Sequence, residues 1–467
     1  MRHPLPKRLL CACLLVLILF TTAACAFLPF NFSFGTPDYF TELSDAKELL
    51  PAGSELPQND GCEYVSDYLE FWGMPSFQPT KLITVEKFYT EYFIGTVPAL
   101  YTLSSTVYDL YRGYFADRTD FNESIPQNVT GALITCFQSA VEDKYAVYMA
   151  PKSFEEYQQS FEANYVGLGI YVQHDSLRDE TVILNVFEGS PAAEAPILKG
   201  DILLSVNGIA LSGATYESAF SLLQGKSGDK VNLLVLRDGE ELSFTLTLRK
   251  IESFSVTWRL LAQDESIAYI KIEEFNAKTA EQFKKAFDAA VAAGAESLIF
   301  DLRDNPGGEI NAIADVLDYL LADGGPIAHF RYKEGSELDK ENSSFYADDG
   351  HATDLPMAVL CNENTASAGE LFTAALRDYN VATVVGETTY GKGTMQNMVS
   401  LPDGSAFTIS VARYDPPYGE NYEGVGIVPH IQVALPAYVE SINAFLRHDE
   451  DDSQLQAAVN ALNAPLV

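Results

Sequence analysis

The residues most able to carry out covalent chemistry lie between positions 364 and 396. Ser367 stands in the run Asn-Thr-Ala-Ser-Ala-Gly-Glu, and Lys392 follows between two glycines, 392 − 367 = 25 positions later. A serine hydroxyl is a weak nucleophile until a base takes its proton. A lysine is a base only as the neutral amine, so its surroundings must lower its pKa from about 10.4. The pair predicts nucleophilic catalysis by Ser367 with Lys392 as the general base.

A third polar residue, Gln396, follows shortly after Lys392. If the chain is extended there, side chains repeat every two residues, and Gln396 lies on the same face as Lys392. A glutamine can hydrogen-bond the amine without adding charge, which orients the base and leaves it neutral. We therefore predict that Gln396 positions Lys392.

The segments around Ser367 predict a strand, a turn and a helix. Residues 356–361 form a short apolar run, which is typical of a buried strand. Residues 370–377 have helical composition, with an acidic residue in the first turn and a basic one in the last. Ser367 then lies at a helix N-terminus that presents free N–H groups, which suits a nucleophile whose product is an oxyanion.

A second glycine-containing turn, Asn-Pro-Gly-Gly at 305–308, follows another predicted strand at 297–302. Strands and helices alternate in this part of the chain, which predicts α/β layering. Because both turns lie at strand ends, they can converge on one crevice. We predict that backbone N–H groups of Gly307, Gly308 and Ala368 supply the oxyanion hole, although Asn-Pro-Gly-Gly alone would usually indicate only a helix start.

Residues 166–250 change to β character, with a predicted hairpin at 230–248 that turns at Asp-Gly. Near the start of this region, Gly-Leu-Gly-Ile at 167–170 forms a loop whose backbone N–H groups can hold a terminal carboxylate. An edge strand beside such a loop can pair with an extended peptide.

Three sequence blocks carry a resemblance to a known family. Residues 301–308 (Asp-Leu-Arg-Asp-Asn-Pro-Gly-Gly), 364–370 and 386–396 resemble the signatures of the C-terminal processing (tail-specific) serine peptidases. Their order and spacing make the signal specific, whereas any single block is weak. The resemblance implies a Ser/Lys dyad supported by Gln at Ser367, Lys392 and Gln396, in a core whose layering resembles the crotonase-type fold.

Residues 166–250 resemble a PDZ domain throughout. This resemblance implies that Leu168, Gly169 and Ile170 form the substrate-binding site for a free C-terminus. The alternative is that the glycines of this loop only shape the entry to a strand. Residues 142–157 resemble the segment before the PDZ domain in this family, where paired helical arms often dimerise, so a homodimer through the helical N-terminal domain is one interpretation.

Composition argues against several partners. The chain of 467 residues carries 30 basic and 65 acidic residues, a net charge of −35. Such a surface repels nucleic acid and anionic membranes, so we expect neither as a partner. The six histidines are scattered and form no His-Glu-x-x-His pattern, so we expect no metal site and no cofactor.

The N-terminus predicts a targeting segment. Basic residues at 2, 7 and 8 precede an apolar run from 9 to 20, which Cys25 follows shortly afterwards. We expect an exported protein outside the cytoplasm, attached to the bacterial cell membrane only through this segment. A lipoprotein anchored at Cys25, a cleaved signal and an uncleaved anchor remain alternatives.

The predicted architecture is a multidomain α/β protein with a helical N-terminal region, a β-rich PDZ domain and a layered α/β peptidase core. Its predicted parts are a signal or anchor segment (1–26), a linker (27–82), a helical N-terminal domain (83–165), a PDZ domain (166–250), a Ser/Lys peptidase domain (251–436) and a C-terminal tail (437–467). Cys62 and Cys136 either form a bridge or stay unpaired, and Cys361 is expected to be a packed thiol. The acidic run at 449–452 is expected to be a solvated face.

These features predict an exported serine endopeptidase that engages the C-terminal end of unfolded or flexible protein substrates. The alternative from another class is a non-catalytic PDZ scaffold that binds peptides at the cell surface, against which the intact Ser/Lys/Gln set argues. A third interpretation, an acyl-CoA enzyme of crotonase type, is disfavoured by Lys392 and by the PDZ insertion.

Overall fold

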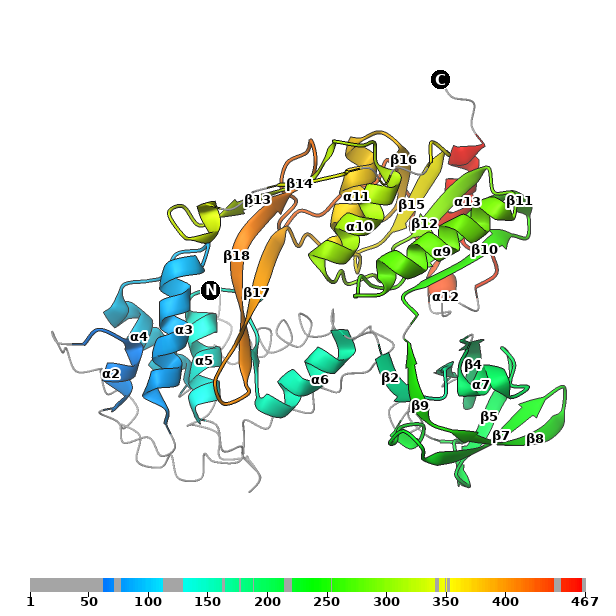
Figure 1. Ribbon diagram of the computed structural model, residues 1–467, viewed down its shortest axis with the longest axis horizontal. Coiled ribbons are helices and arrows are strands. Elements are labelled where there is room, and N and C mark those ends of the chain that lie inside the picture. Colours follow the sequence, from blue (N-terminus) through cyan, green and yellow to red (C-terminus); the bar gives the residue numbers. More distant parts are fainter. Residues whose placement is uncertain are drawn as a thin grey trace, which may run out of the picture.

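The fold is taken from a computed structural model of the chain. It describes residues 62–70, 77–111, 129–161, 164–175, 178–187, 189–213, 221–252, 254–340, 344–348, 350, 353–440 and 447–463. A helical region, a PDZ-like β domain and a layered core follow one another along the chain (Figure 1). The predicted targeting segment lies outside the described residues. No helix within the described ranges has both the length and the apolar character needed to cross a bilayer.

The helical region begins earlier than the sequence predicted. Its helices are α2 (Val65–Glu70), α3 (Pro79–Tyr92), α4 (Leu100–Tyr111), α5 (Val129–Ala140) and α6 (Pro151–Phe161). The first two start inside the predicted linker 27–82, so the boundary at 83 was wrong. The short α2 was missed because its six residues are too few for a helical period to stand out.

Aromatic side chains of the helical region build its core. Tyr89, Tyr108, Tyr111 and Phe137 are all buried, and Tyr89 packs edge-on against Phe137 with ring centres 5.2 Å apart. These aromatic side chains therefore form core, while a dimer surface on this region stays a prediction.

A five-stranded antiparallel sheet joins the helical region to the rest of the molecule (Figure 1). Its strands are β1 (Tyr148–Met149), β13 (Pro326–Tyr332), β14 (Ser344–Tyr346), β17 (Thr394–Ser400) and β18 (Ala406–Asp415). One edge of β18 pairs first with β1, at Tyr148 and Phe407, and then with β13, at His329 and Asp415. The other edge pairs with β17 along its length, so β18 carries contacts from both regions.

The PDZ-like domain is a six-stranded sheet with a two-stranded sheet beside it. The larger sheet has the path β3-β4-β5-β7-β8, and β6 pairs with β5. The bounds are β2 (Asn164–Gly167), β3 (Ile170–Asp175), β4 (Glu180–Val186), α7 (Pro191–Glu194), β5 (Ile202–Val206), β6 (Ile209–Ala210), β7 (Lys230–Arg237), β8 (Glu240–Thr247) and β9 (Arg249–Glu252). In this order β3 is an edge strand, as peptide pairing requires.

The core is a six-stranded sheet in the order β10-β11-β12-β15-β16-β19. All neighbours are parallel except β10 and β11. The strands are β10 (Val256–Leu261), β11 (Asp264–Ile272), β12 (Ser297–Asp301), β15 (Met357–Cys361), β16 (Ala382–Gly386) and β19 (Ile431–Gln432).

Helices cover both faces of this sheet because its strands are apolar on both sides. The helices are α9 (Thr279–Ala292), α10 (Ile310–Leu320), α11 (Ala368–Asp378), α12 (Ala437–Glu440) and α13 (Ser453–Leu462), with a 3₁₀ turn at Leu338–Lys340. Phe300 on β12 packs with α9, α10 and α11, whereas its neighbour Ile299 packs with α13 on the other face. This alternation confirms the predicted α/β layering.

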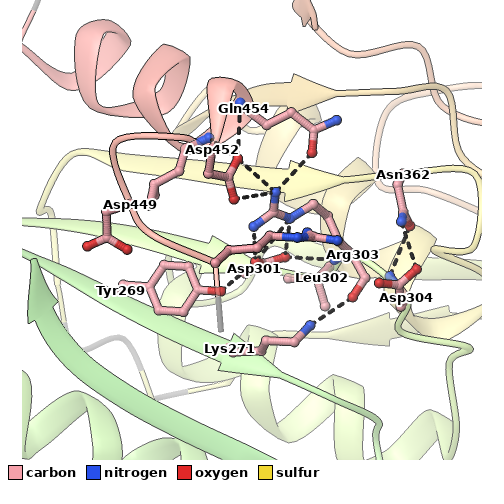
Figure 2. Close-up of polar contacts among 12 residues, drawn as sticks. Tyr269, Lys271, Asp301, Leu302, Arg303, Asp304, Asn362, Asp449, Asp452 and Gln454 are labelled. Carbon is pink, nitrogen blue, oxygen red and sulfur yellow. Dashed lines mark hydrogen bonds and ion pairs between the residues drawn. The ribbon is translucent and has the colours of Figure 1, made fainter. Parts of the chain in front are cut away.

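The C-terminal acidic run is a solvated face only in part. Glu450 and Asp451 are exposed, as predicted, whereas Asp452 is buried and pairs with Arg303 at 2.8 Å (Figure 2). Asp449 is half-buried and pairs with Arg259. The prediction failed for Asp452 because a run of like charge reveals nothing about cations supplied by distant strands.

The cysteines carry no disulfide in the described chain. Cys62 and Cys136 are free thiols, so of the two interpretations left open by the sequence the unpaired one holds. Cys361 is buried in β15, as expected for a packed thiol, and burial raises its pKa.

Candidate active site

Ser367 lies between the end of β15 and the start of α11, at the strand-to-helix turn that the sequence predicted. Its φ is +54°, a conformation that is uncommon for residues with a side chain and that concentrates at functional sites. Hydrogen bonds to the segment that follows β12 hold this turn in place. The Ala366 N–H donates to the Asn305 carbonyl (2.9 Å), and the Thr365 hydroxyl donates to the Leu302 carbonyl (2.8 Å).

The two glycine-containing turns do converge. A Cβ on Gly307 would lie 2.6 Å from the Ser367 Cβ and 2.9 Å from the Ala368 nitrogen, so only glycine fits this approach. Asp304 adds a second link, because its Oδ1 accepts hydrogen bonds from the side chains of Asn362 (2.8 Å) and Asn364 (2.9 Å).

Hydrogen bonding narrows the candidates for the oxyanion hole. The Gly307 N–H already donates to the Asn305 side chain (2.8 Å) and is therefore occupied. The N–H groups of Gly308 and Ala368 have no hydrogen-bond partner among the residues that the structure describes. Gly308 and Ala368 are thus the better candidates, and their convergence on one oxygen stays a prediction.

Glu370 joins the nucleophile turn to the loop that carries Lys392 (residues 387–393, here the lysine loop). Its Oε2 accepts the N–H groups of Ser367 (2.9 Å) and Lys392 (2.7 Å). Its Oε1 accepts the Gly391 N–H (2.6 Å) and the Thr389 hydroxyl (2.5 Å). Burial raises the pKa of the Glu370 carboxyl, and these hydrogen bonds oppose the rise.

Tyr414 on β18 contacts the residue proposed as the base. Its hydroxyl donates to the Lys392 carbonyl (2.5 Å). Burial raises the pKa of Tyr414, whereas the nearby Ser367 side chain lowers it, so the phenol stays protonated and keeps its donor. The backbones of Ser367 and Lys392 are therefore joined by the Glu370 carboxylate, and the phenol adds a further hydrogen bond on the lysine side.

Gln396 lies on β17, but strand alternation does not place it on the same face as Lys392, contrary to what the sequence suggested. The strand begins at Thr394, after Lys392, so strand alternation does not extend to the lysine. The Gln396 side-chain amide donates to the Thr394 carbonyl (2.9 Å). Its support of the Lys392 amine stays a prediction.

Sequence reasoning missed Glu370 and Tyr414 as functional residues. The acidic position at the start of α11 indicated only a helix N-terminus, because first-turn acids are common there. Tyr414 gave no signal, since a tyrosine in an apolar strand is typical of core packing. A glutamate directly after a nucleophile turn is the one signal that could have suggested a linking role.

The peptide-capture loop of the PDZ-like domain stands beside edge strand β3. The carbonyls of Leu168 and Gly169 accept hydrogen bonds from Ala192 and Phe187 (2.9 Å each), whereas their N–H groups have no partner within the described chain. Gly169 has a φ of +73°, and a Cβ there would lie 2.1 Å from the Ser190 Cβ. Ile170 begins β3 and pairs with Val186. This arrangement suits carboxylate capture, which stays a prediction.

Asp301 and Arg303 of the 301–308 block form a buried charge network at the end of β12 (Figure 2). Asp301 lies 2.6 Å from the Arg303 guanidinium and accepts the Tyr269 hydroxyl (2.5 Å). Burial works against the Asp301 charge, but Arg303 and Lys271 hold the pKa of that carboxyl below its ordinary value. The block therefore combines a charge network that anchors β12 with a glycine turn that reaches Ser367.

Comparisons with known proteins identify the family of the chain. Residues 266–433 match the family described as peptidase family S41, and residues 166–248 match the PDZ domain. The chain is 30% identical over 333 residues to the carboxy-terminal processing protease CtpA of Bacillus subtilis, covering 71% of this chain and 70% of that protein. It is 30% identical over 302 residues to the carboxyl-terminal-processing protease of Synechocystis sp., covering 64% and 69%.

Among solved structures, a putative S41 protease from Bacteroides fragilis has the same fold. The TM-score is 0.54 at 16% identity, covering 83% of this chain and 98% of the other. Fold and site thus define a serine protease with a PDZ domain. The chain belongs to peptidase family S41, within the carboxy-terminal processing proteases.

Proposed function

We propose that this protein is an exported serine endopeptidase that cuts polypeptides engaged by their C-termini. Ser367 is the nucleophile, Lys392 the general base, and Gln396 its support. The observation that carries the proposal is the Glu370 carboxylate, which receives both the Ser367 and the Lys392 N–H groups. One carboxylate thereby fixes the backbone of both catalytic positions.

The proposed chemistry follows from these positions. Neutral Lys392 takes the proton from the Ser367 Oγ as that oxygen attacks the scissile carbonyl carbon. The N–H groups of Gly308 and Ala368 stabilise the oxyanion. The lysine then gives its proton to the leaving amine, and the C–N bond breaks. Water, deprotonated by the same lysine, hydrolyses the acyl-enzyme and releases Ser367.

Substrate capture belongs to the PDZ-like domain in this proposal. The N–H groups of Leu168 and Gly169, which have no partner among the described residues, receive a terminal carboxylate. The edge of β3 pairs with the preceding residues of the substrate. Export and membrane attachment through residues 1–26 rest on the sequence of that segment. The proposed substrates are therefore proteins outside the cytoplasm.

Incubation of the full chain with an unfolded protein tests the proposal. Ser367→Ala and Lys392→Ala should each lower kcat by about three orders of magnitude or more, because loss of a nucleophile or base removes covalent catalysis. Mass spectrometry of the products gives the rates and the cut sites, and circular dichroism checks the fold. Wild-type cleavage should also slow as pH falls, since a protonated lysine accepts no proton. Cleavage by folded Ser367→Ala at the wild-type rate would leave only the peptide-binding scaffold.

A further inference from the structure

A second carboxylate, Glu423, holds the lysine loop directly after the residues that Glu370 holds. Its Oε2 accepts the Gly393 N–H (2.9 Å) and the Thr394 hydroxyl (2.9 Å). Glu370 accepts the N–H groups of residues 391 and 392. Three consecutive backbone N–H groups, those of residues 391 to 393, therefore donate to two carboxylates. These hydrogen bonds fix the backbone on both sides of the lysine.

The other oxygen of Glu423 faces the helical region. Its Oε1 accepts the Tyr145 hydroxyl (2.7 Å), and the Lys144 ammonium forms an ion pair with it. Burial works against the Glu423 charge, but Lys144 and Tyr145 hold the pKa of that carboxyl below its ordinary value. Glu423 is therefore ionised near neutral pH, and a charged acceptor makes the stronger hydrogen bonds.

Tyr145 also contacts the proposed base directly. The Lys392 Nζ lies 5.1 Å from the centre of the Tyr145 ring, so the ring lies beside the amine. The Tyr145 hydroxyl is 3.5 Å from the carbonyl of Gly391, the residue before the lysine. A single side chain from the helical region thus lies beside the lysine amine and beside the backbone that precedes the lysine.

The segment that carries Tyr145 is fastened to the strand beside the lysine loop. Asp143 accepts the Ser410 hydroxyl (2.6 Å) and its N–H (3.0 Å). Val147 exchanges two hydrogen bonds of 2.8 Å with Thr408. Both partners lie on β18, which pairs with β17, the strand that continues from the lysine loop. Tyr145 is consequently held in a fixed position relative to Lys392.

We infer that Tyr145 and Glu423 are positioning residues for Lys392, so that the N-terminal helical region completes the active site. This inference rests on the proposed function. Tyr145 lies outside residues 266–433, which match the peptidase family, so the peptidase segment alone lacks part of the arrangement. The phenol hydroxyl and the carboxylate fix the loop backbone, and the ring limits where the amine can lie.

Kinetics of the full chain with a fluorogenic peptide test the inference. Tyr145→Leu should lower kcat by about 10- to 100-fold and change KM by less than about threefold, because a misplaced base affects the chemical step. Tyr145→Phe keeps the ring and loses the hydrogen bond, so it should recover much of that loss. Glu423→Gln should lower kcat by about tenfold. Tyr145→Phe removes the hydrogen bond to Glu423, and Glu423→Gln weakens the same bond because the acceptor loses its charge. Their combined loss should therefore be smaller than the product of the single losses.

Tyr319→Phe is the matched control. Its hydroxyl donates to Asp288 (2.7 Å), so the variant loses a tyrosine–carboxylate hydrogen bond between α10 and α9 without touching the lysine loop or the Tyr145 segment. It should lower the melting temperature slightly and leave kcat unchanged. Equal losses of kcat in Tyr319→Phe and Tyr145→Leu, or a kcat of Tyr145→Leu within twofold of wild type, would overturn the inference.

Hydrogen exchange of the lysine-loop amides gives a readout that needs no turnover. Exchange measured by mass spectrometry should speed up for the Gly393 amide in Tyr145→Leu and Glu423→Gln, and stay at the wild-type rate in Tyr319→Phe. Unchanged exchange in the first two variants would overturn the inference even in an inactive protein. Failure of the proposed function shows instead as wild-type cleavage equal to that of Ser367→Ala.

Discussion

Two fully buried carboxylates of the core, Asp301 and Glu370, are stabilised in opposite ways. Asp301 at the end of β12 is paired with the Arg303 guanidinium, and its pKa is held below the ordinary value. Glu370 in the first turn of α11 accepts three backbone N–H groups and one threonine hydroxyl. Burial raises its pKa despite these hydrogen bonds.

The difference shows that buried carboxylates in the same core have different structural roles, which depend on their partners. The Asp301–Arg303 pair reaches Asp452, so charge fastens β12 to the C-terminal helix α13. Glu370 fastens two loops to each other through neutral donors. Loss of the Asp301–Arg303 pair should therefore lower mainly the stability of the protein. Loss of the Glu370 carboxylate should lower mainly the catalytic rate.

Removal of Arg303 should have the largest effect on the molecule. Arg303→Ala leaves Asp301 and Asp452 buried without their cation, and breaking such a pair costs about 3–5 kcal/mol. The free energy of unfolding measured in urea should fall by about that amount. Arg259→Ala is the control, because its pair with Asp449 is partly exposed and such pairs contribute about 1 kcal/mol or less. Equal losses in the two variants would contradict a special role for the buried pair.

Glu370→Gln should have the next largest effect, and it should act on rate. The glutamine has one acceptor oxygen in place of two and turns an NH₂ group towards N–H donors, so the two loops separate slightly. We expect kcat/KM to fall by about 100-fold, the loss that a displacement of about 1 Å produces. Glu363→Gln, an exposed glutamate in the same turn, is the control. A kcat/KM within threefold of wild type would show that the link is dispensable.

The pH dependence of stability should show the smallest effect. The folded pKa of Asp301 is lowered, so its stabilisation is fully present above the unfolded pKa of about 3.9 and is lost as pH falls below it. Urea unfolding between pH 3 and 6 should therefore show a steeper acid loss in wild type than in Asp301→Asn. Parallel curves for the two proteins would mean that Asp301 keeps an ordinary pKa in the folded state.

The sequence predicted the elements around the site with useful accuracy. The predicted strands 297–302 and 356–361 correspond to β12 (Ser297–Asp301) and β15 (Met357–Cys361). The hairpin turn at Asp238 and Gly239 has positive φ at both residues, as Asp-Gly turns require. These predictions succeeded because periodicity and turn chemistry are properties of adjacent residues.

The predictions that failed concern partners far apart in the chain. The acidic run 449–452 was interpreted as solvated, yet Asp452 meets Arg303 from 149 positions away. Glu370 was interpreted as a helix marker, although its other donors lie on the lysine loop. Local composition cannot show which distant donor a carboxylate meets.

The sequence by itself determined the serine, the lysine, the glycine turns and the order of the domains, because each depends on residue type and short spacing. The tertiary structure alone decided that the Gly307 N–H donates to the Asn305 side chain and that the Tyr414 hydroxyl donates to the Lys392 carbonyl. It also decided that Tyr145, from another region, lies beside the proposed base. These contacts depend on how strands pair and helices pack, and no local pattern specifies those distances.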